Sequence, residues 1–270
     1  MLLRLLAVLF ISLAARENLS ASLLVYEGFD YGPSGSALLS NNGGSGFSNA
    51  WSTAPGPANT DPYVLNNSTL TDGLLQTSGQ SASSIAISGI GGLARTFNQT
   101  FGADVTTIYM SVLMRPEGVL NAGFSFGYFG MFLQSNANHL FLGKPGGGDV
   151  NHWGMEVQGG GGQVSTGVGA VVGQTVLLVV RADFLPGADK FTLYLDPTPG
   201  GPEPLTGTVK NDADAGTITG LEIFSGGAFS IDEIRIGNTF ADVTPVPEPT
   251  TAALMLASVA LLSALKKVCR

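Results

Sequence analysis

The chain has 270 residues, of which 44% are hydrophobic and 12% charged, and its 12 Lys and Arg against 20 Asp and Glu leave a formal charge of −8. This acidic balance disfavours binding to nucleic acid or to anionic lipid, because both are negatively charged themselves. The single cysteine, Cys269, is the next-to-last residue, so we expect neither disulfides nor thiol chemistry in the body of the chain.

The first 22 residues have the order of a secretory signal peptide. Arg4 gives a positively charged start, residues 5–14 are apolar, and small residues follow. Cleavage after Ala14 and cleavage after Ser22 both fit, and we favour Ser22 because residues 23–26 already have the pattern of a strand. The alternative is an uncleaved membrane anchor. The sequence therefore predicts export through the inner membrane.

Short apolar runs separated by turn residues fill residues 23–244. The chain has 38 glycines, about twice the usual frequency. Side chains alternate with period two in residues 108–115 and 191–196, whereas residues 176–180 are continuously apolar, as in a strand covered on both faces. Further strands are predicted at 23–29, 74–77, 84–87, 93–97, 123–132, 139–143, 153–157, 220–224 and 229–236. We expect an all-β fold, an antiparallel β-sandwich of the jelly-roll type.

Three segments between these runs are predicted to be loops. Gly, Ser, Asn and Pro dominate residues 32–62, and a Pro-rich run opens residues 197–217. The four consecutive glycines at 159–162 indicate a hairpin tip or a connector. They do not indicate a phosphate-binding loop, because no Gly-Lys-Ser/Thr follows and no helix is expected to begin there.

Both ends of this region carry short motifs of one fold family. Residues 26–31 read YEGFDY, and residues 231–237 read IDEIRIG. The second motif resembles the last strand of laminin G-like and concanavalin A-like jelly rolls. Residues 141–145, 177–183 and 191–197 are similar to exported proteins that carry such a domain. The resemblance implies one domain over residues 23–244, with its first and last strands side by side.

The carboxyl groups argue against an enzyme. Glucanases of this fold carry two glutamates and an aspartate close together on one strand, and no such triplet occurs here. Retaining hydrolysis needs two carboxyls about 5–5.5 Å apart, which same-face positions of one strand provide. Glu156 and Glu222 each stand alone on a predicted strand, and Asp232 and Glu233 are adjacent and so face opposite ways. We therefore expect a protein without catalytic activity.

Calcium is the metal that the resemblance implies, held in loops by hard oxygen ligands. Asp212 and Asp214 are the closest pairing and are the candidate ligands. The alternative is that each aspartate caps a turn or faces solvent. His139 and His152 are the only histidines, and we expect them to lie singly in loops. Asp232 is predicted to be structural and to accept backbone hydrogen bonds near the terminal strands.

Sugar binding needs an exposed aromatic ring with amides or carboxylates beside it. Trp51 stands in a polar segment and is our candidate for such a platform. Trp153 lies in a predicted strand, and we expect it to be buried. Tyr63 and Tyr128 are further candidates by residue type.

The chain closes on a segment of three parts, residues 245–270. A Pro-rich box comes first, an apolar run follows at 250–265, and the basic residues stand last; the box is Val246, Pro247, Glu248 and Pro249, and the basic residues are Lys266, Lys267 and Arg270. As a helix, the apolar run would span about 24 Å, which is short for a hydrocarbon core of about 30 Å. This favours a transient transmembrane helix over a permanent anchor. The alternative is a buried core helix.

This order resembles the PEP-CTERM sorting signal of Gram-negative bacteria. The resemblance implies that an exosortase, an integral-membrane cysteine protease, cuts near the box and releases the protein to the cell exterior. Lys and Arg beside a membrane span resist translocation, so the basic end is expected to stay in the cytoplasm. The membrane is then a partner only until processing.

Removal of both signals leaves residues 23–249, which hold seven Lys and Arg against nineteen Asp and Glu, a formal charge of −12. We expect a non-catalytic surface or extracellular-matrix protein that contacts exopolysaccharide in a biofilm. The alternatives are a polysaccharide-active enzyme with an unrecognised site and a purely structural envelope protein. Exposed aromatics beside a concave face would favour the first reading, and paired carboxyls in a cleft would favour the enzyme.

Overall fold

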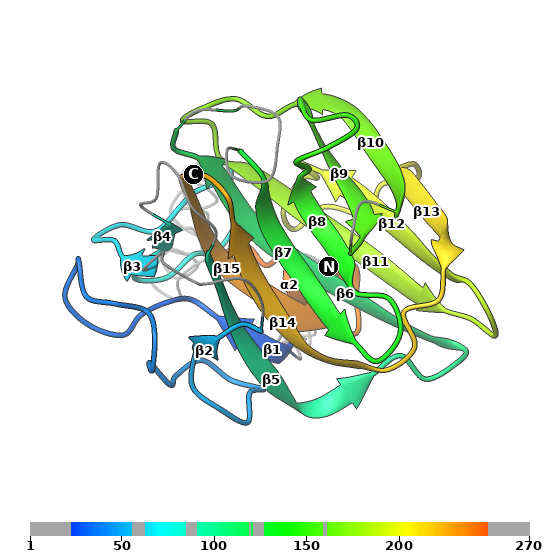
Figure 1. The fold of residues 1–270 in the computed structure, drawn as a ribbon, viewed down its shortest axis with the longest axis horizontal. Coiled ribbons are helices and arrows are strands. Elements are labelled where there is room, and N and C mark those ends of the chain that lie inside the picture. The colour runs from blue at the N-terminus through cyan, green and yellow to red at the C-terminus, as the bar shows by residue number, and fades with distance from the viewer. Residues whose placement is uncertain are drawn as a thin grey trace, which may run out of the picture.

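The computed structural model describes residues 23–55, 63–84, 91–118, 120, 127–158 and 161–247. In this part of the chain two antiparallel sheets pack face to face, as Figure 1 shows, so the expected all-β sandwich is confirmed. The predicted signal peptide and residues 248–270 of the predicted sorting signal lie outside the described residues. No helix among the described residues is both long and apolar enough to cross a membrane.

One sheet has eight strands. Seven of them are ordered β13 (Thr208–Ala213), β12 (Asp189–Leu195), β11 (Val176–Phe184), β6 (Thr106–Pro116), β15 (Phe229–Gly237), β4 (Ala82–Ser84) and β3 (Tyr63–Leu65), and β1 (Leu23–Glu27) pairs with β15. The predicted pairing of the first and last strands is confirmed, because Leu23 lies opposite Gly237 and Glu27 opposite Ile234. Strands β1 and β4 thus share one edge of β15, which would otherwise be an unpaired edge.

The other sheet has seven strands. They are ordered β10 (Gly161–Gly169), β9 (His152–Val157), β8 (Leu140–Lys144), β7 (Phe129–Ser135), β14 (Ile218–Ser225), β5 (Gly91–Phe101) and β2 (Ser52–Thr53). The consecutive strands β7 to β10 pair as antiparallel neighbours. Strand β14, which comes much later in the sequence, lies between β7 and β5 and pairs with both. This sheet faces the viewer in Figure 1.

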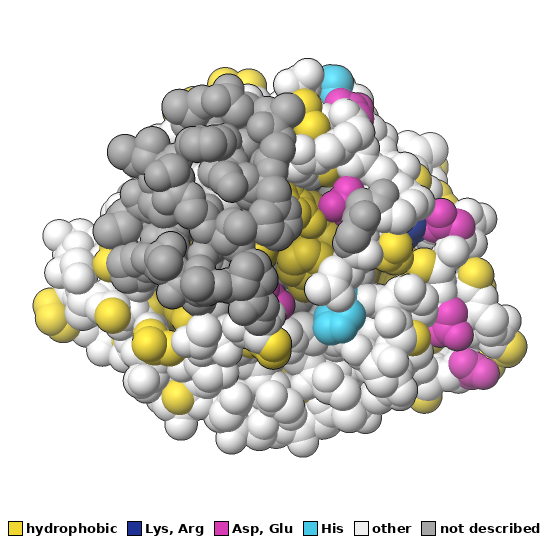
Figure 2. All heavy atoms as spheres, in the orientation of Figure 1, with side chains coloured by type: hydrophobic (Ala, Val, Ile, Leu, Met, Phe, Trp, Pro, Cys, Tyr) yellow, Lys and Arg dark blue, Asp and Glu magenta, His cyan; other side chains and the backbone are white. Residues whose placement is uncertain are grey.

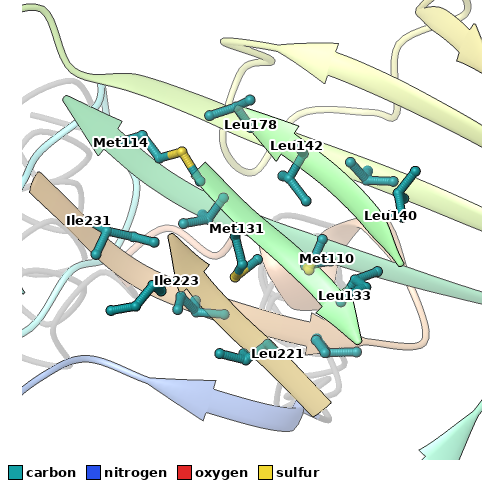
Figure 3. Packing of buried hydrophobic residues seen from close by; sticks show 14 of the residues in the cluster. Met110, Met114, Met131, Leu133, Leu140, Leu142, Leu178, Leu221, Ile223 and Ile231 are labelled. Atoms are coloured by element: carbon teal, nitrogen blue, oxygen red, sulfur yellow. The ribbon is translucent and has the colours of Figure 1, made fainter. Parts of the chain in front are cut away.

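Alternate side chains of both sheets meet between the layers and form the main core. Figure 3 shows Leu178 of β11 there with Met110 of β6 and Met131 of β7, and all three are buried. Each fully buried aliphatic side chain stabilises the fold by about 1.5–3 kcal/mol. Because side chains alternate along a strand, Leu177 and Arg181 point away from this core to the outer face of the eight-stranded sheet.

A short helix, α2 (Phe240–Val243), covers part of that outer face. Phe240 packs edge-on against Tyr109 and Tyr194, with ring centroids 6.3 and 6.1 Å apart. The side chain of Thr239 accepts a hydrogen bond from the Asp242 backbone, which caps the start of the helix. The helix closes a second, smaller hydrophobic cluster outside the sandwich core.

Two sequence expectations about individual segments were wrong, because residues 74–77 form a turn and coil and the predicted loop at 197–217 contains strand β13. The glycine run lies where the antiparallel strands β9 and β10 connect, as expected of a hairpin tip, but strand β10, which begins at Gly161, was not predicted. Both missed strands lie at sheet edges and are largely exposed, so they carry no apolar alternation that period-two reasoning could detect. Lys210 of β13 donates to the carbonyl of Gly162, 2.6 Å away, and so joins the two edges.

Candidate functional site

Two glutamates that are alone on their strands share a row on the outer face of the seven-stranded sheet. Glu222 of β14 lies opposite Phe132 of β7, Phe132 lies opposite Phe141 of β8, and Phe141 lies opposite Glu156 of β9. Directly opposed residues of antiparallel strands point to the same side of the sheet. The four side chains therefore form one row across the sheet, which we call the Glu–Phe–Phe–Glu row.

The two phenylalanines of the row belong to a cluster of four aromatic rings. Tyr128 lies 4.9 Å from Phe141 and 5.0 Å from Phe224, and Phe132 lies 5.0 Å from Phe141, measured between ring centroids. Aromatic pairs at such distances attract one another beyond the gain from burial alone. The four rings are only 0–8% exposed, so the cluster is a packed floor rather than a set of free-standing rings.

Glycines beside the row leave room for the Phe141 ring. Gly130 of β7 lies opposite Gly143 of β8. A Cβ atom on Gly130 would come within 2.7 Å of the Phe141 ring and 2.3 Å of the Leu142 carbonyl, and one on Gly143 would come within 2.3 Å of the Phe129 carbonyl. Any side chain at these two positions would therefore push the ring off the sheet.

Glu156 is a buried, fixed carboxyl at one end of the row. It is 4% exposed, and it accepts hydrogen bonds from the Tyr128 hydroxyl at 3.1 Å and from the Gln163 amide at 2.9 Å. Burial raises the pKa of Tyr128, and the charge of Glu156 raises it further, so the phenol remains a hydrogen-bond donor. Gln163 in turn donates to the carbonyl of Gly147, which ties the loop before β9 to the row.

Glu222 is the more accessible carboxyl at the other end. Its only hydrogen bond among the described residues comes from the Gln134 amide at 3.2 Å, and both side chains are partly exposed. Burial raises the pKa of Glu222 to about 7, and the bond from Gln134 offsets only part of that effect. Near neutral pH this group therefore exists in both protonation states, and it can both donate and accept hydrogen bonds.

The spacing of the two carboxyls limits the chemistry of the row. Three strand intervals separate Glu222 from Glu156, and at about 4.8 Å each they place the two backbones about 14 Å apart. Paired catalytic carboxyls of glycosidases stand about 5–5.5 Å apart in retaining enzymes and about 6.5–9.5 Å apart in inverting ones. The row therefore resembles a polar and aromatic surface more than a catalytic pair.

Figure 2 shows this face of the molecule, with hydrophobic side chains gathered in its middle and Asp, Glu and His side chains beside them. In the sequence, each glutamate stands between two apolar residues that are expected to face inward, which predicts that its carboxyl points outward from the sheet. This pattern could have identified Glu156 and Glu222 as two outward-pointing carboxyls. It could not have placed them in one row, because the register between strands is not local in the sequence.

Trp51 does not form the predicted exposed platform. Its side chain is 1% exposed and stacks on Phe29 with ring centroids 5.9 Å apart. The indole N–H donates to Oε2 of Glu27 at 3.1 Å, and this buried partner draws the ring inward despite its polar neighbours in sequence. The prediction of exposure was wrong, whereas the predicted burial of Trp153 is confirmed.

Asp212 and Asp214 do not form the predicted calcium site. Asp212 pairs with Lys210 at 2.6 Å, and Asp214 accepts a hydrogen bond from the Gly216 backbone at 2.7 Å, as a turn-capping aspartate does. No group of three or more His, Cys, Asp or Glu suited to a metal occurs among the residues that the structure describes. The donor set at these two aspartates therefore does not fit calcium, which usually takes six to eight oxygens.

The remaining candidates have separate local roles. His152 pairs with Asp149 at 2.6 Å at the start of β9, whereas His139 lies beside the other end of that strand, so the structure does not bring the histidines together. Asp232 accepts backbone hydrogen bonds from Leu70 and Glu233, both at 2.8 Å, which confirms its predicted structural role.

The start of the predicted sorting motif lies at the margin of the domain. Pro245 accepts a backbone hydrogen bond from Gln76, and Thr244 accepts one from Gly200, each at 2.8 Å. Val246 and Pro247 follow directly and are exposed, Val246 by 37%. Glu248 and Pro249 lie outside the described residues.

Comparison with solved structures identifies the architecture. The globular domain of T. cruzi calreticulin superposes with a TM-score of 0.51 at 12% identity, covering 92% of this chain and 100% of that one. The shared fold is a jelly roll of the concanavalin A-like type. This confirms the fold that the motifs at 26–31 and 231–237 implied, and at this identity the likeness concerns the fold alone.

Other solved structures with this jelly roll are more distant. The carbohydrate recognition domain of Emp47p has a TM-score of 0.41 at 10% identity and covers 78% of this chain and 96% of its own. Lectin UEA-II complexed with galactose has a TM-score of 0.42 at 7% identity and covers 80% of this chain and 99% of its own. No family model matches the chain, and no curated protein matches it.

Proposed function

We propose that the protein is an exported, non-catalytic surface or matrix protein that binds carbohydrate on the outer face of its seven-stranded sheet. The observation that carries this proposal is the Glu–Phe–Phe–Glu row, with a carboxyl at each end of an aromatic cluster. Ligand sites commonly combine apolar and aromatic walls with a few fixed polar groups, which suits the C–H faces and hydroxyls of a sugar.

Hydrogen bonding is expected to contribute more than ring stacking at this site. The four rings are largely buried, so they offer little ring surface to a ligand. Glu222 and Gln134 are partly exposed, and together they offer donors and acceptors to sugar hydroxyls. The formal charge of −12 over residues 23–249 repels anionic polymers, so a neutral exopolysaccharide is the favoured ligand class for this face.

A polysaccharide-active enzyme is the second candidate, and the raised pKa of Glu222 favours it. Its pKa of about 7 suits a general acid at neutral pH. The backbone spacing of about 14 Å to Glu156 weighs against a carboxyl pair. A purely structural envelope protein is the third alternative and would bind no glycan.

Export and processing complete the proposal. We infer that residues 1–22 direct secretion and that an exosortase cuts near Val246–Pro249, which leaves the jelly roll at the cell surface or in a biofilm matrix. Among the residues that the structure describes, the last backbone hydrogen bonds are those to Thr244 and Pro245, and Val246 is exposed, which supports access of a protease to the box.

Affinity electrophoresis tests the binding site. Native gels containing a neutral β-glucan, a galactan or alginate are run with the wild type and with Glu222→Ala. We expect a neutral polymer to retard the wild type, and the variant to bind it about tenfold more weakly, because hydrogen bonds to a charged group contribute about 1.5–3 kcal/mol. Reducing-sugar release is measured on the same polymers and should match a heat-inactivated sample.

Glu117→Ala is the control, since Glu117 is a solvent-accessible carboxyl that pairs with Arg115 at the end of β6, in the other sheet. Its binding should equal that of the wild type. Retardation by neither the β-glucan nor the galactan, or an equal loss in both variants, contradicts the proposed site. Release of sugar above the heat-inactivated sample would favour the enzyme instead.

A further inference from the structure

A pocket of about 520 Å³ opens on the opposite side of the molecule, over the outer face of the eight-stranded sheet. Its volume falls in the range of about 300–1,000 Å³ that is common for small-molecule sites. It lies where the loop 203–207 meets the three strands at one end of that sheet, and its lining includes Arg181, Lys190, Glu203, Leu205, Thr206 and Val209.

The pocket gathers most of the positive charge that the body of the protein shows to solvent. Four of the seven Lys and Arg in residues 23–249 are buried, namely Arg95, Lys144, Lys210 and Arg235. The other three are Arg115, Arg181 and Lys190, and two of these line the pocket. Arg181 is already paired with Asp183 and Glu203, so Lys190 is the cation of this pocket whose charge is not balanced by the lining.

Glu203, the one carboxylate of the lining, already has its partners. It accepts hydrogen bonds from the Tyr194 hydroxyl at 2.6 Å and the Tyr109 hydroxyl at 2.8 Å, and Arg181 lies 3.4 Å away. Burial alone would raise the pKa of Glu203, but these hydrogen bonds and the charge of Arg181 outweigh that effect and lower the pKa. Glu203 therefore stays ionised, and its charge is balanced within the protein.

Lys190 is the charge that remains for a ligand. It lies opposite Asp183 across β11 and β12, but Asp183 is held by Nε of Arg181, at 2.9 and 3.0 Å to its two oxygens, and by the Thr107 hydroxyl at 2.7 Å. Within the described part of the chain, no ion pair or hydrogen bond reaches the Lys190 ammonium group. An anionic group entering the pocket would give it a partner.

Apolar and hydroxyl groups complete the lining. Leu205 is fully exposed at the rim, and Val209 is 41% exposed. Thr206 is exposed and adds a hydroxyl group to the lining. A simple inorganic anion would leave the apolar rim unused, and a neutral sugar would leave Lys190 unpaired.

We propose that this pocket binds a uronic acid, that is, a sugar that carries a carboxylate. Lys190 pairs with the carboxylate, Thr206 and the neighbouring backbone bind ring hydroxyls, and Leu205 covers a C–H face. This site is separate from the Glu–Phe–Phe–Glu row, because the two lie on opposite faces of the sandwich. Either site can therefore fail its test without affecting the other.

Isothermal titration of the protein with sodium D-glucuronate and sodium D-galacturonate tests the proposal, with D-glucose and acetate as comparison ligands. We expect saturable binding of at least one uronate that weakens with added salt. Lys190→Gln should reduce its affinity about tenfold or more, whereas Lys190→Arg, which keeps the charge, should retain most of it.

Arg115→Gln is the control, because Arg115 is the third solvent-accessible cation of residues 23–247 and lies outside the pocket lining. Its uronate affinity should equal that of the wild type. Absence of saturable binding for both uronates overturns the proposal. Binding of acetate or glucose as tight as that of the uronates, or an equal loss in Lys190→Gln and Arg115→Gln, also overturns it.

Discussion

At the scale of single residues, the protonation state of Glu222 depends on its surroundings in the fold. Its carboxyl is packed above Gly92, where even a Cβ atom would come within 2.6 Å of Oε1. Gln134 gives it a single hydrogen bond, so burial dominates and the pKa rises to about 7. Between about pH 4.5 and pH 7, Glu222 is therefore protonated in the folded protein but ionised in the unfolded chain.

This difference predicts a pH-dependent stability. Because the pKa is higher in the folded state, the contribution of Glu222 is fully present below about pH 4.5 and is lost as the pH rises through about 7. Between these limits, the free energy of unfolding of the wild type should fall relative to that of Glu222→Gln. Urea denaturation of both proteins across this range measures the difference. Parallel curves would show that Glu222 titrates normally.

Asp232 titrates in an overlapping range, since burial raises its pKa to about 8. It is present in both proteins, so its effect cancels in the comparison. The difference between the wild type and Glu222→Gln therefore reports on Glu222 alone.

At the scale of elements, one buried ion pair joins the two sheets. Glu27 ends β1 in the eight-stranded sheet, Arg95 lies on β5 in the seven-stranded sheet, and their side chains, each 1% exposed, meet at 2.7 Å. Glu27 also accepts from the Phe29 backbone and the Trp51 indole, and Arg95 donates to the Gly43 carbonyl. The network thus fixes the irregular segment after β1 against both sheets.

Breaking this pair should be costly. Arg95→Met leaves Glu27 as a buried charge without its cation, and we expect a loss of about 3–5 kcal/mol in the free energy of unfolding, measured by urea denaturation. Arg115→Met, which removes a surface pair with Glu117, should lose at most about 1 kcal/mol. Similar midpoints for both variants would show that the network does not stabilise the fold.

The elements also show which features a sequence can reveal. Strands with an inward-facing apolar residue at every second position, such as β6 and β12, were predictable because the whole alternating pattern lies within one short segment of the sequence. The edge strands β10 and β13 were not, since a solvated edge needs no apolar alternation. The burial of Trp51 was not predicted, because its hydrogen-bond partner Glu27 lies 24 residues earlier in the chain and is not visible in the local sequence.

At the scale of the whole molecule, the sandwich offers two chemically different outer faces. One carries the Glu–Phe–Phe–Glu row and its glycines, and the other carries α2 and the cationic pocket. The main core lies between the sheets and is shared by both faces. Substitutions of exposed groups on one face should therefore leave the other unchanged, which allows the two proposed sites to be tested separately.

The central claim is that carbohydrate binds over the row. Its most direct test is NMR mapping of the isotope-labelled protein with an oligosaccharide of the polymer that retards it in native gels. We predict that the largest changes in chemical shift fall on β7, β8 and β14, at Phe132, Gln134, Phe141 and Glu222. Changes confined to α2, β11 and β12, or no saturable changes on the seven-stranded sheet, would contradict the claim.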